Sequence, residues 1–395
     1  MKDKLKKIYF MIERFFLGFK RKKDVLFVAR NELTFDYTYI IYKHLTGDER
    51  LRVWFCLVSP KNFLDYAQIK KKFKLRTIAY EIARKLKWDL VMLPDHGPYF
   101  RDDCPKIYVN HGISSGKSKK GEHYIYSDRA RGNDGRILYE KIFLTSNTLK
   151  EQVREHYPDF HECIAVVGSL CADEMMEVDR MAVRRDKLAG LGLSPEKKTA
   201  FIASSWGPHC LIQSEGERLI EEVNKLREEY NIILSIHLHN FHVESHYKGL
   251  DMKVLLGKLR KDNVCVLEPK QSTHLLLPFS DILLTDMTSL SLYYPLLKRP
   301  VVFYDNRDVK YALSGLVPEL REISFSVDDV SGLSSKFRKA EEEFDPAVME
   351  EFSKKVFSFQ GQAWERVSEE IHEILGLDHP VEGSTVSSHE ATVLL

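Results

Sequence analysis

Short apolar runs that alternate with helical stretches constrain the fold of this chain more than any other feature. They form two series, at residues 25–29, 53–58, 90–93, 107–110, 142–145 and 164–167, and then at 199–204, 232–238, 264–267, 282–285 and 301–304. Strands that alternate with helices are typical of parallel βαβ units with right-handed crossovers. Because the charged stretch 173–198 separates the two series, we predict an α/β fold with two doubly wound, Rossmann-like parallel sheets.

The stretch from residue 281 to 305 combines a buried strand, a polar elbow, an apolar helix and a second buried strand. In the elbow, Thr285, Asp286, Thr288 and Ser289 precede the helix. Hydroxyls and unpaired backbone N–H groups at a helix N-terminus can hold a phosphate. Thr and Ser are also ordinary helix N-caps, so this pattern alone leaves both interpretations open.

Candidate ligand-binding residues follow several of the predicted strands. In doubly wound sheets, ligands bind at the carboxyl ends of the strands. The residues predicted at these ends are His111, Ser146, Gly168, Ser204, His239, Glu268 and Thr285. We therefore expect the functional site to be built from the loops that contain them.

His111 is followed by a small, hydroxyl-rich and basic loop that contains Gly112, Ser114, Ser115 and Lys117. Glycines allow the backbone to approach a ligand closely. A histidine titrates near neutral pH and can accept the proton of an attacking hydroxyl. We predict His111 as a general base, although a histidine satisfied by the backbone at a strand end would give the same pattern.

His237 and His239 are two residues apart on a predicted strand, so their side chains should lie on the same face. This H-x-H pattern could supply half of a metal site, but no matching cluster of Asp or Cys is evident in the sequence. The other interpretation is that the imidazoles donate hydrogen bonds to a phosphate and stabilise its charge.

In combination, these motifs resemble the CDP-glycerol glycerophosphotransferases, a family that includes teichoic-acid primases and polymerases. The elbow at 285–289 is similar to the family's T-D-Y-S-S segment, and residues 298–304 resemble the Lys-x-Pro strand that follows it. Residues 109–112 resemble the His-Gly motif, and residues 145–147 resemble the strand-end serine. Residues 237–240 resemble the basic-x-His-Pro motif, with Asn240 in place of proline. The resemblance covers residues 105–310.

The resemblance implies a GT-B fold with a cleft between two domains, and a transfer that needs neither a metal nor a cofactor. His111 would deprotonate a hydroxyl of a lipid-linked or polymeric glycan acceptor, on the side of Gly112, Ser114, Ser115 and Lys117. The donor would be a CDP-linked polyol phosphate, and CMP would leave. Its phosphates would contact the catalytic His239 together with His237, Thr285, Thr288 and Ser289. The nucleotide side would contain Ser204, Ser205, Gly168, Glu268 and Asp286. The implied role is synthesis of a cell-envelope polymer such as teichoic acid.

The chain departs from the family pattern at two arginines. Residues 203–207 resemble an A-P-T-x-R segment without its arginine, and Cys171 replaces the arginine of a G-x-P-R-x-D segment that keeps Gly168 and Asp173. Arginine is the usual bidentate phosphate ligand, so the identity of the transferred group stays open. The alternatives are a GT-B glycosyltransferase that uses a CMP- or UDP-sugar, and a catalytically silent nucleotide-binding scaffold.

Charge is distributed unevenly along the chain. Residues 1–150 contain 32 Lys and Arg against 17 Asp and Glu, whereas the rest contains 27 against 41. Residues 1–23 alone hold nine Lys and Arg against two acids, with Leu5, Ile8, Phe15 and Phe16 on one helical face. This composition predicts an amphipathic helix in the headgroup region of an anionic membrane. The same helix could instead pack on its own domain. Nucleic acid is not a predicted partner, because no recognised binding module accompanies the charge.

We predict four segments: a membrane-associating helix at residues 1–23, an acceptor-side domain at 24–185, a nucleotide-donor domain at 186–375 and a disordered tail at 376–395. No apolar run is long enough to span a bilayer, so we expect a peripheral protein on the cytoplasmic face of the cell membrane. The six cysteines include no C-x-x-C pair, which predicts neither a zinc ribbon nor a disulfide framework.

Overall fold

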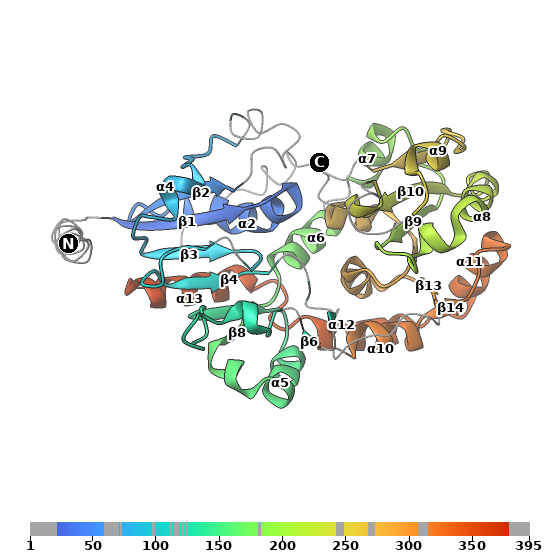
Figure 1. The fold of residues 1–395 in the computed structure, drawn as a ribbon. Helices are drawn as coiled ribbons and strands as arrows, with labels where there is room; N and C mark the ends of the chain where they lie inside the picture. The colour runs from blue at the N-terminus through green and yellow to red at the C-terminus, as the bar shows by residue number, and fades with distance from the viewer. Residues whose placement is uncertain are drawn as a thin grey trace, which may run out of the picture. The chain divides into compact units, whose positions relative to one another are not determined.

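The computed structural model describes residues 22–58, 71, 73–96, 99–110, 113, 118–119, 122–123, 125–180, 183–241, 249–267, 273–306 and 315–378. The helix predicted at residues 1–23 and the tail predicted at 376–395 therefore lie almost entirely outside the described residues. Described residues up to Tyr108, together with those from Ser368 onward, form one compact unit, and those of Val109–Val367 form a second (Figure 1).

Six strands form the first sheet, in the order β2-β1-β3-β4-β7-β8. They are β1 (Lys23–Ala29), β2 (Leu51–Leu57), β3 (Leu90–Leu93), β4 (Lys106–Tyr108), β7 (Lys141–Leu144) and β8 (Ile164–Val166). β1 pairs in parallel with β2 and β3, and its apolar residues are buried, as expected for a strand covered on both faces. Tyr42, from α2 (Glu32–Leu45), packs edge-on against Phe27 and Phe55, with ring centroids 5.7 and 5.3 Å away.

The second sheet also has six strands, in the order β11-β10-β9-β12-β13-β14, and every neighbouring pair is parallel. They are β9 (Thr199–Ser204), β10 (Asn231–Ile236), β11 (Val264–Val266), β12 (Ile282–Thr285), β13 (Val301–Tyr304) and β14 (Phe325–Val327). The central strand β9 is buried along its whole length. The predicted α/β fold with two parallel sheets is therefore confirmed.

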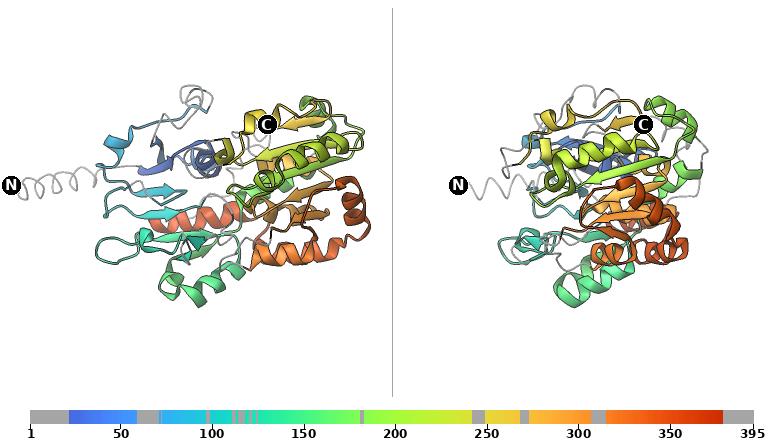
Figure 2. Two further views of the ribbon diagram at one scale, coloured as in Figure 1. Left: turned by 45° about the vertical axis from the view of Figure 1, so that its right-hand side comes forward. Right: turned by 90° about the vertical axis from the view of Figure 1, so that its right-hand side faces the viewer.

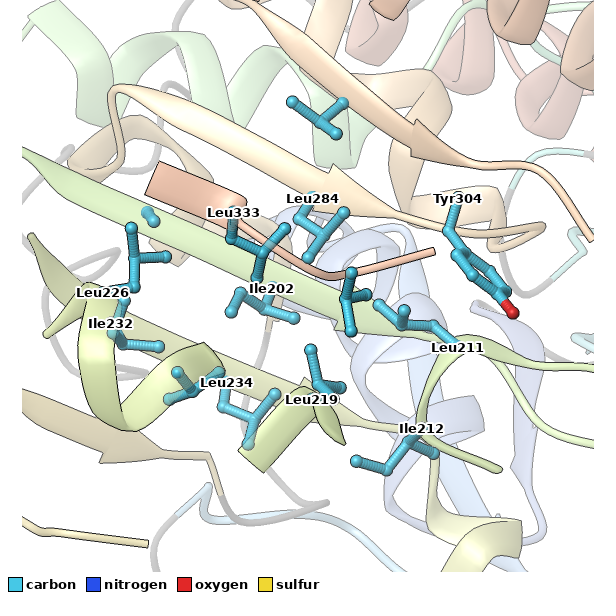
Figure 3. Close-up of a cluster of buried hydrophobic side chains, with 14 of the residues drawn as sticks. Ile202, Leu211, Ile212, Leu219, Leu226, Ile232, Leu234, Leu284, Tyr304 and Leu333 are labelled. Atoms are coloured by element: carbon cyan, nitrogen blue, oxygen red, sulfur yellow. The ribbon is translucent and has the colours of Figure 1, made fainter. Parts of the chain in front are cut away.

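The core of the second unit forms between this sheet and α8 (Leu211–Leu226). Leu219 and Leu226 of the helix pack with Ile202 and Leu234 of the central strands, and all four side chains are buried (Figure 3). In both views of Figure 2, α8 runs along the strands of this sheet. Apolar residues at helical spacing explain why this segment covers the sheet. Packing here determines the position of the loops at the carboxyl ends of β9 and β10.

The remaining described helices connect or cover the strands. They are α4 (Tyr80–Ala83), α5 (Asn147–His156), α6 (Leu170–Arg180), α7 (Arg184–Gly190), α9 (Met252–Leu256), α10 (Leu316–Ile323), α11 (Leu333–Glu342), α12 (Pro346–Val356) and α13 (Ala363–Leu375), with 3-10 helices η2 (Asp128–Ala130), η3 (Pro158–Cys163), η4 (Leu238–Phe241), η6 (Thr273–Phe279) and η7 (Ser289–Leu297). A short antiparallel pair joins β5 (Ser118–Lys119) and β6 (Glu122–His123). The chain changes sheet between Val166 and Thr199. The predicted boundary between residues 185 and 186 lies in this interval, and the domain limits stay a prediction.

Within the described residues, no helix combines the length and the apolar character that crossing a bilayer requires. The six cysteines form no disulfide with one another, and five of them are buried.

Candidate active site

Three loops leave the second sheet side by side at its carboxyl edge. β9 lies between β10 and β12, and all three run parallel. Ser204 pairs with Ile236 of β10, while the preceding residue of β9, Ala203, pairs with Thr285 of β12. The three strands therefore end within one residue of the same position along the sheet. This register brings the predicted site residues of the three loops to one edge, where doubly wound sheets bind ligands.

Asp286 forms the buried centre of this edge and is 2% exposed. Its carboxylate accepts hydrogen bonds from the backbone N–H of Ser205 (2.8 Å) and of Leu211 (2.7 Å), and from the hydroxyl of Ser204 (3.1 Å). Leu211 is the first residue of α8, so the acid also lies at the positive end of that helix. The Asp286 side chain thus holds the β9–α8 loop against the elbow, rather than facing outward.

Ser204 and Ser205, both predicted at the nucleotide side, have different environments. The Ser204 hydroxyl donates to Asp286 and accepts the N–H of Ile212 at 3.0 Å, so it belongs to the internal network. The Ser205 hydroxyl is buried and has no hydrogen-bond partner among the described residues. The Cys210 thiol contacts Asn240. Burial raises the pKa of this thiol to about 11, and the charge of Asp286 adds to this effect. The thiol therefore stays protonated at neutral pH.

His237 and His239 are not on a strand, because β10 ends at Ile236. His237 N–H donates the last hydrogen bond between β10 and β9, to Ser204 O at 3.1 Å. Asn240 N–H then donates to His237 O at 2.9 Å, and this bond begins the turn of η4. The turn nevertheless brings the two rings together, with centroids 5.0 Å apart. The expectation that the two side chains share a strand face is therefore wrong, because both residues lie in the turn after the strand.

The two histidines and Trp206 form an aromatic cluster. The indole lies 5.0 Å from the His239 ring in an edge-on arrangement and 6.1 Å from the His237 ring. His237 Nδ1 accepts the backbone N–H of His239 at 3.2 Å, which leaves the proton of a neutral ring on Nε2. Trp206 is 38% exposed, which is unusual for such a large apolar side chain at a sheet edge. The cluster therefore offers imidazole donors and an exposed aromatic face.

The elbow after β12 has the predicted form of strand, turn and helix. Thr288 is the N-cap of η7, and its hydroxyl accepts the N–H of Leu290 at 3.3 Å. Thr285 is buried and its hydroxyl donates to Asp286 O, whereas Thr288 and Ser289 are partly exposed. The helix is a 3-10 helix that ends at Lys298, which has a left-handed conformation. Thr288 and Ser289 are thus the elbow hydroxyls within reach of a ligand.

Gly168 packs against the segment after α12. It has φ +77°, and a Cβ placed on it would lie 2.8 Å from Ser358 O. The Asp173 carboxylate accepts the N–H groups of Gly361 (2.7 Å) and Ala363 (3.0 Å). Cys171, at the position of the missing arginine, is buried. This motif therefore binds the C-terminal segment.

Several predicted site residues cannot be placed. His111, Gly112, Ser114, Ser115, Lys117 and Glu268 lie outside the described residues. Asn110, directly before His111, has φ 65°, in the left-handed region. The roles assigned to these residues stay predictions.

Asn240 was not predicted as a site residue, although it is fully buried at this edge. Its amide nitrogen donates to Ser205 O at 2.7 Å, and its amide oxygen accepts from Gln213 Nε2 at 3.3 Å. The signal in the sequence is the asparagine itself, which occupies the proline position of the family motif. Among the residues whose positions are described, no group of three His, Cys, Asp or Glu side chains could hold a metal ion.

Two parallel six-stranded sheets, with histidines and hydroxyls at the carboxyl edge of the second, place the chain in the α/β class with a GT-B-like fold. Residues 206–373 match the family model described as CDP-Glycerol:Poly(glycerophosphate) glycerophosphotransferase. The predicted resemblance is confirmed over this part of the chain, and the match supports an enzyme of the CDP-glycerol glycerophosphotransferase type. No curated protein sequence matches the chain.

Solved structures agree with this fold. The wall teichoic acid polymerase TagF is 15% identical with a TM-score of 0.64, and the match covers 90% of each chain. The MnaA–UDP complex from S. aureus is 13% identical with a TM-score of 0.58, covering 91% of this chain and all of the other. The UDP-GlcNAc 2-epimerase from Neisseria meningitidis is 14% identical with a TM-score of 0.55, covering 89% and 100%. At these identities the likeness concerns the fold.

Proposed function

We propose that the protein transfers a polyol phosphate, glycerol phosphate or a close relative, from a CDP-linked donor to a hydroxyl of a lipid-linked or polymeric glycan acceptor. The observation that carries this proposal is the meeting of His237, His239 and Trp206 with the Thr288–Ser289 elbow at one sheet edge, inside the segment that matches the family model. The function belongs to the synthesis of a cell-envelope polymer.

In this proposal, the acceptor oxygen attacks the β-phosphorus of the donor as the bond to the bridging oxygen breaks. CMP leaves with the electron pair, and His111 takes the acceptor proton. The Nε2–H group of His237, the His239 ring and the hydroxyls of Thr288 and Ser289 hold the diphosphate. Such preorganised donors stabilise charge that develops on the leaving group. We expect the transfer to proceed in the presence of a chelator, without a cofactor.

The nucleotide separates this proposal from its alternatives. Thermal unfolding of the full-length protein should be measured with CDP, CMP, UDP and CDP-glycerol. A ligand that binds only the folded state raises the melting temperature. We expect stabilisation by the cytidine nucleotides and most by CDP-glycerol. Selectivity for UDP would favour a sugar transferase, which the fold shared with the UDP-bound MnaA structure keeps as the second candidate. No shift with any nucleotide would indicate a silent scaffold.

Replacement of both elbow hydroxyls tests the phosphate contacts. The Thr288→Ala/Ser289→Ala variant should stay folded, because loss of one N-cap costs about 1 kcal/mol. Its CDP affinity, measured by calorimetry, should fall at least about tenfold, since hydrogen bonds to a charged group are worth about 1.5–3 kcal/mol each. The matched control is Ser334→Ala/Ser335→Ala at the start of α11, where the hydroxyls bond Glu229 and Gly332 O. Equal CDP affinity of the elbow variant and this control would contradict the assignment.

Residues 1–23 are proposed to bind an anionic membrane. Deletion of this segment removes nine Lys and Arg together with its aromatic face. We expect sedimentation with phosphatidylglycerol vesicles to fall sharply, while transfer to a soluble acceptor analogue persists. Binding of the full-length protein should weaken with salt, because the Debye length shrinks from about 10 Å at 0.1 M to about 3 Å at 1 M. Equal sedimentation with and without the segment would show that it packs on the protein instead.

A further inference from the structure

Both backbone groups of Ser205 are held by buried side chains from the two flanking loops. Its N–H bonds to Asp286, from the β12 loop, at 2.8 Å, and its C=O accepts from Asn240, from the β10 loop, at 2.7 Å. Asp286 and Asn240 are 2% and 0% exposed. Bonds to such groups cannot be replaced by water without rearrangement, and a lost partner leaves a buried polar atom unsatisfied. The position of Ser205 is therefore set from both sides.

The Asn240–Ser205 bond joins the neighbours of two residues of the proposed donor site. Asn240 follows His239 directly, and Ser205 precedes Trp206 directly. The rings of His239 and Trp206 lie 5.0 Å apart, edge-on. The family motif has proline at the position of Asn240, and proline carries no amide side chain. Asn240 also accepts from Gln213, at 3.3 Å, and contacts the Cys210 thiol, so it ties the β9–α8 loop at further points.

We propose that Asn240 is a positioning residue of the donor site, which holds His239 against Trp206 through its hydrogen bond to the Ser205 carbonyl. This inference rests on the proposed function, because it takes His239 as a ligand of the donor diphosphate. The amide would compensate for part of what the chain lacks at the two missing motif arginines, because it orients an imidazole and an indole before the donor binds. Orientation fixed before binding is not lost as entropy when the donor binds.

The Asn240→Asp variant tests the bond, because only the amide or a protonated carboxyl can donate to Ser205 O. CDP affinity of the full-length protein should be measured by calorimetry from pH 5 to pH 8 and expressed relative to wild type at each pH. At pH 8 we expect an affinity about tenfold below wild type, the size of one lost hydrogen bond to a buried group. As the pH falls, protonation of the introduced carboxyl restores the donor, and the ratio should approach one. His237, His239, Cys210 and Asp286 are present in both proteins, so their own titration cancels in the ratio to first order.

Asn224→Asp is the matched control. Its amide also donates to a backbone carbonyl, Lys258 O at 3.0 Å, and its oxygen accepts Arg260 N–H at 2.8 Å, in the same unit but between α8 and the residues after α9. Its CDP affinity should equal that of wild type at every pH. An Asn240→Ala variant, which introduces no charge, should bind weakly with no pH recovery, and it serves as the second test if Asn240→Asp does not fold.

The coupling to Trp206 gives a second readout that general destabilisation would not produce. In a Trp206→Ala background, Asn240→Ala should weaken CDP binding much less than it does alone, because the partner of His239 is already gone. A folded Asn240→Ala protein with wild-type CDP affinity, or a loss in Asn240→Asp that does not change with pH, would overturn the inference. If His239→Ala weakens CDP binding and the Asn240 variants do not, the inference alone fails. If wild type binds no CDP, or His239→Ala has no effect, the proposed function fails and the inference with it.

Discussion

His111→Ala should lower the turnover of phosphate transfer by about 10²–10⁴-fold, the usual contribution of a positioned general base. CDP affinity should stay within about twofold of wild type, because the proposed partner of His111 is the acceptor hydroxyl and not the donor. Single-turnover transfer to an acceptor analogue measures the first quantity, and calorimetry with CDP measures the second.

His239→Ala provides the contrast, since its imidazole is assigned to the donor diphosphate. This variant should lose both CDP affinity and turnover. If His111→Ala kept most of its turnover at neutral pH, the general-base role would be wrong. If it lost CDP affinity as strongly as His239→Ala, His111 would belong to the donor side.

Asp286→Ala should lower the free energy of unfolding by roughly 3–5 kcal/mol, the range for breaking a buried charge network. Removal of the carboxylate leaves the N–H groups of Ser205 and Leu211 and the hydroxyl of Ser204 without their acceptor. Asp286→Asn should also be strongly destabilising, because its NH₂ group would face one of these donors. Urea denaturation followed by circular dichroism measures the loss.

Asp305→Asn is the control for this prediction. Asp305 follows the next strand of the same sheet, but its carboxylate is partly exposed and pairs with Arg321 at 3.3 Å. A partly exposed ion pair contributes about 0–1 kcal/mol, so this variant should unfold close to wild type. An Asp286 variant as stable as Asp305→Asn would show that the acid is available for a ligand after all.

The strands could be predicted because buried parallel strands are short, continuous apolar runs. Four of them, β3, β9, β12 and β13, have the predicted bounds. β14 (Phe325–Val327) was missed because it is an edge strand of three residues with a serine at its centre. The charged stretch 173–198 contains most of α6 and all of α7. Apolar periodicity therefore predicts buried strands and helices well, but it predicts edge strands and the breaks between helices poorly.

The end of β10 shows where prediction from pattern failed. Ile232 to Leu238 is a suitable apolar run, but the main-chain bond between Asn240 and His237 O begins a turn after Ile236. The side chain of Asn240 in this turn bonds to Ser205, which is 35 residues earlier in the chain. A contact over such a distance has no local signature in the sequence.

The sequence pattern also could not predict which residues of the elbow are buried and which are exposed. Asp286 and Thr288 are two residues apart and both polar, yet one is buried in a network and the other is partly exposed. Arg299 could be expected to be a phosphate ligand from its charge alone. The structure shows it bonded to Pro278 O, Ser280 O and Asp179. Sequence indicates which residue types gather at the edge, and the three-dimensional contacts decide which of them can face a ligand.

The G-x-x-x-x-D motif at Gly168 and Asp173 has a consequence for how relatives of this protein are recognised. Its two retained residues hold the segment 358–363, and its replaced arginine is a buried cysteine. A side chain at Gly168 would collide with backbone, so loss of the glycine would disrupt the fold whatever the substrate. A motif of this kind therefore identifies proteins in which a C-terminal segment packs against it. Substrate classes should instead be distinguished by the residues between Gly168 and Asp173.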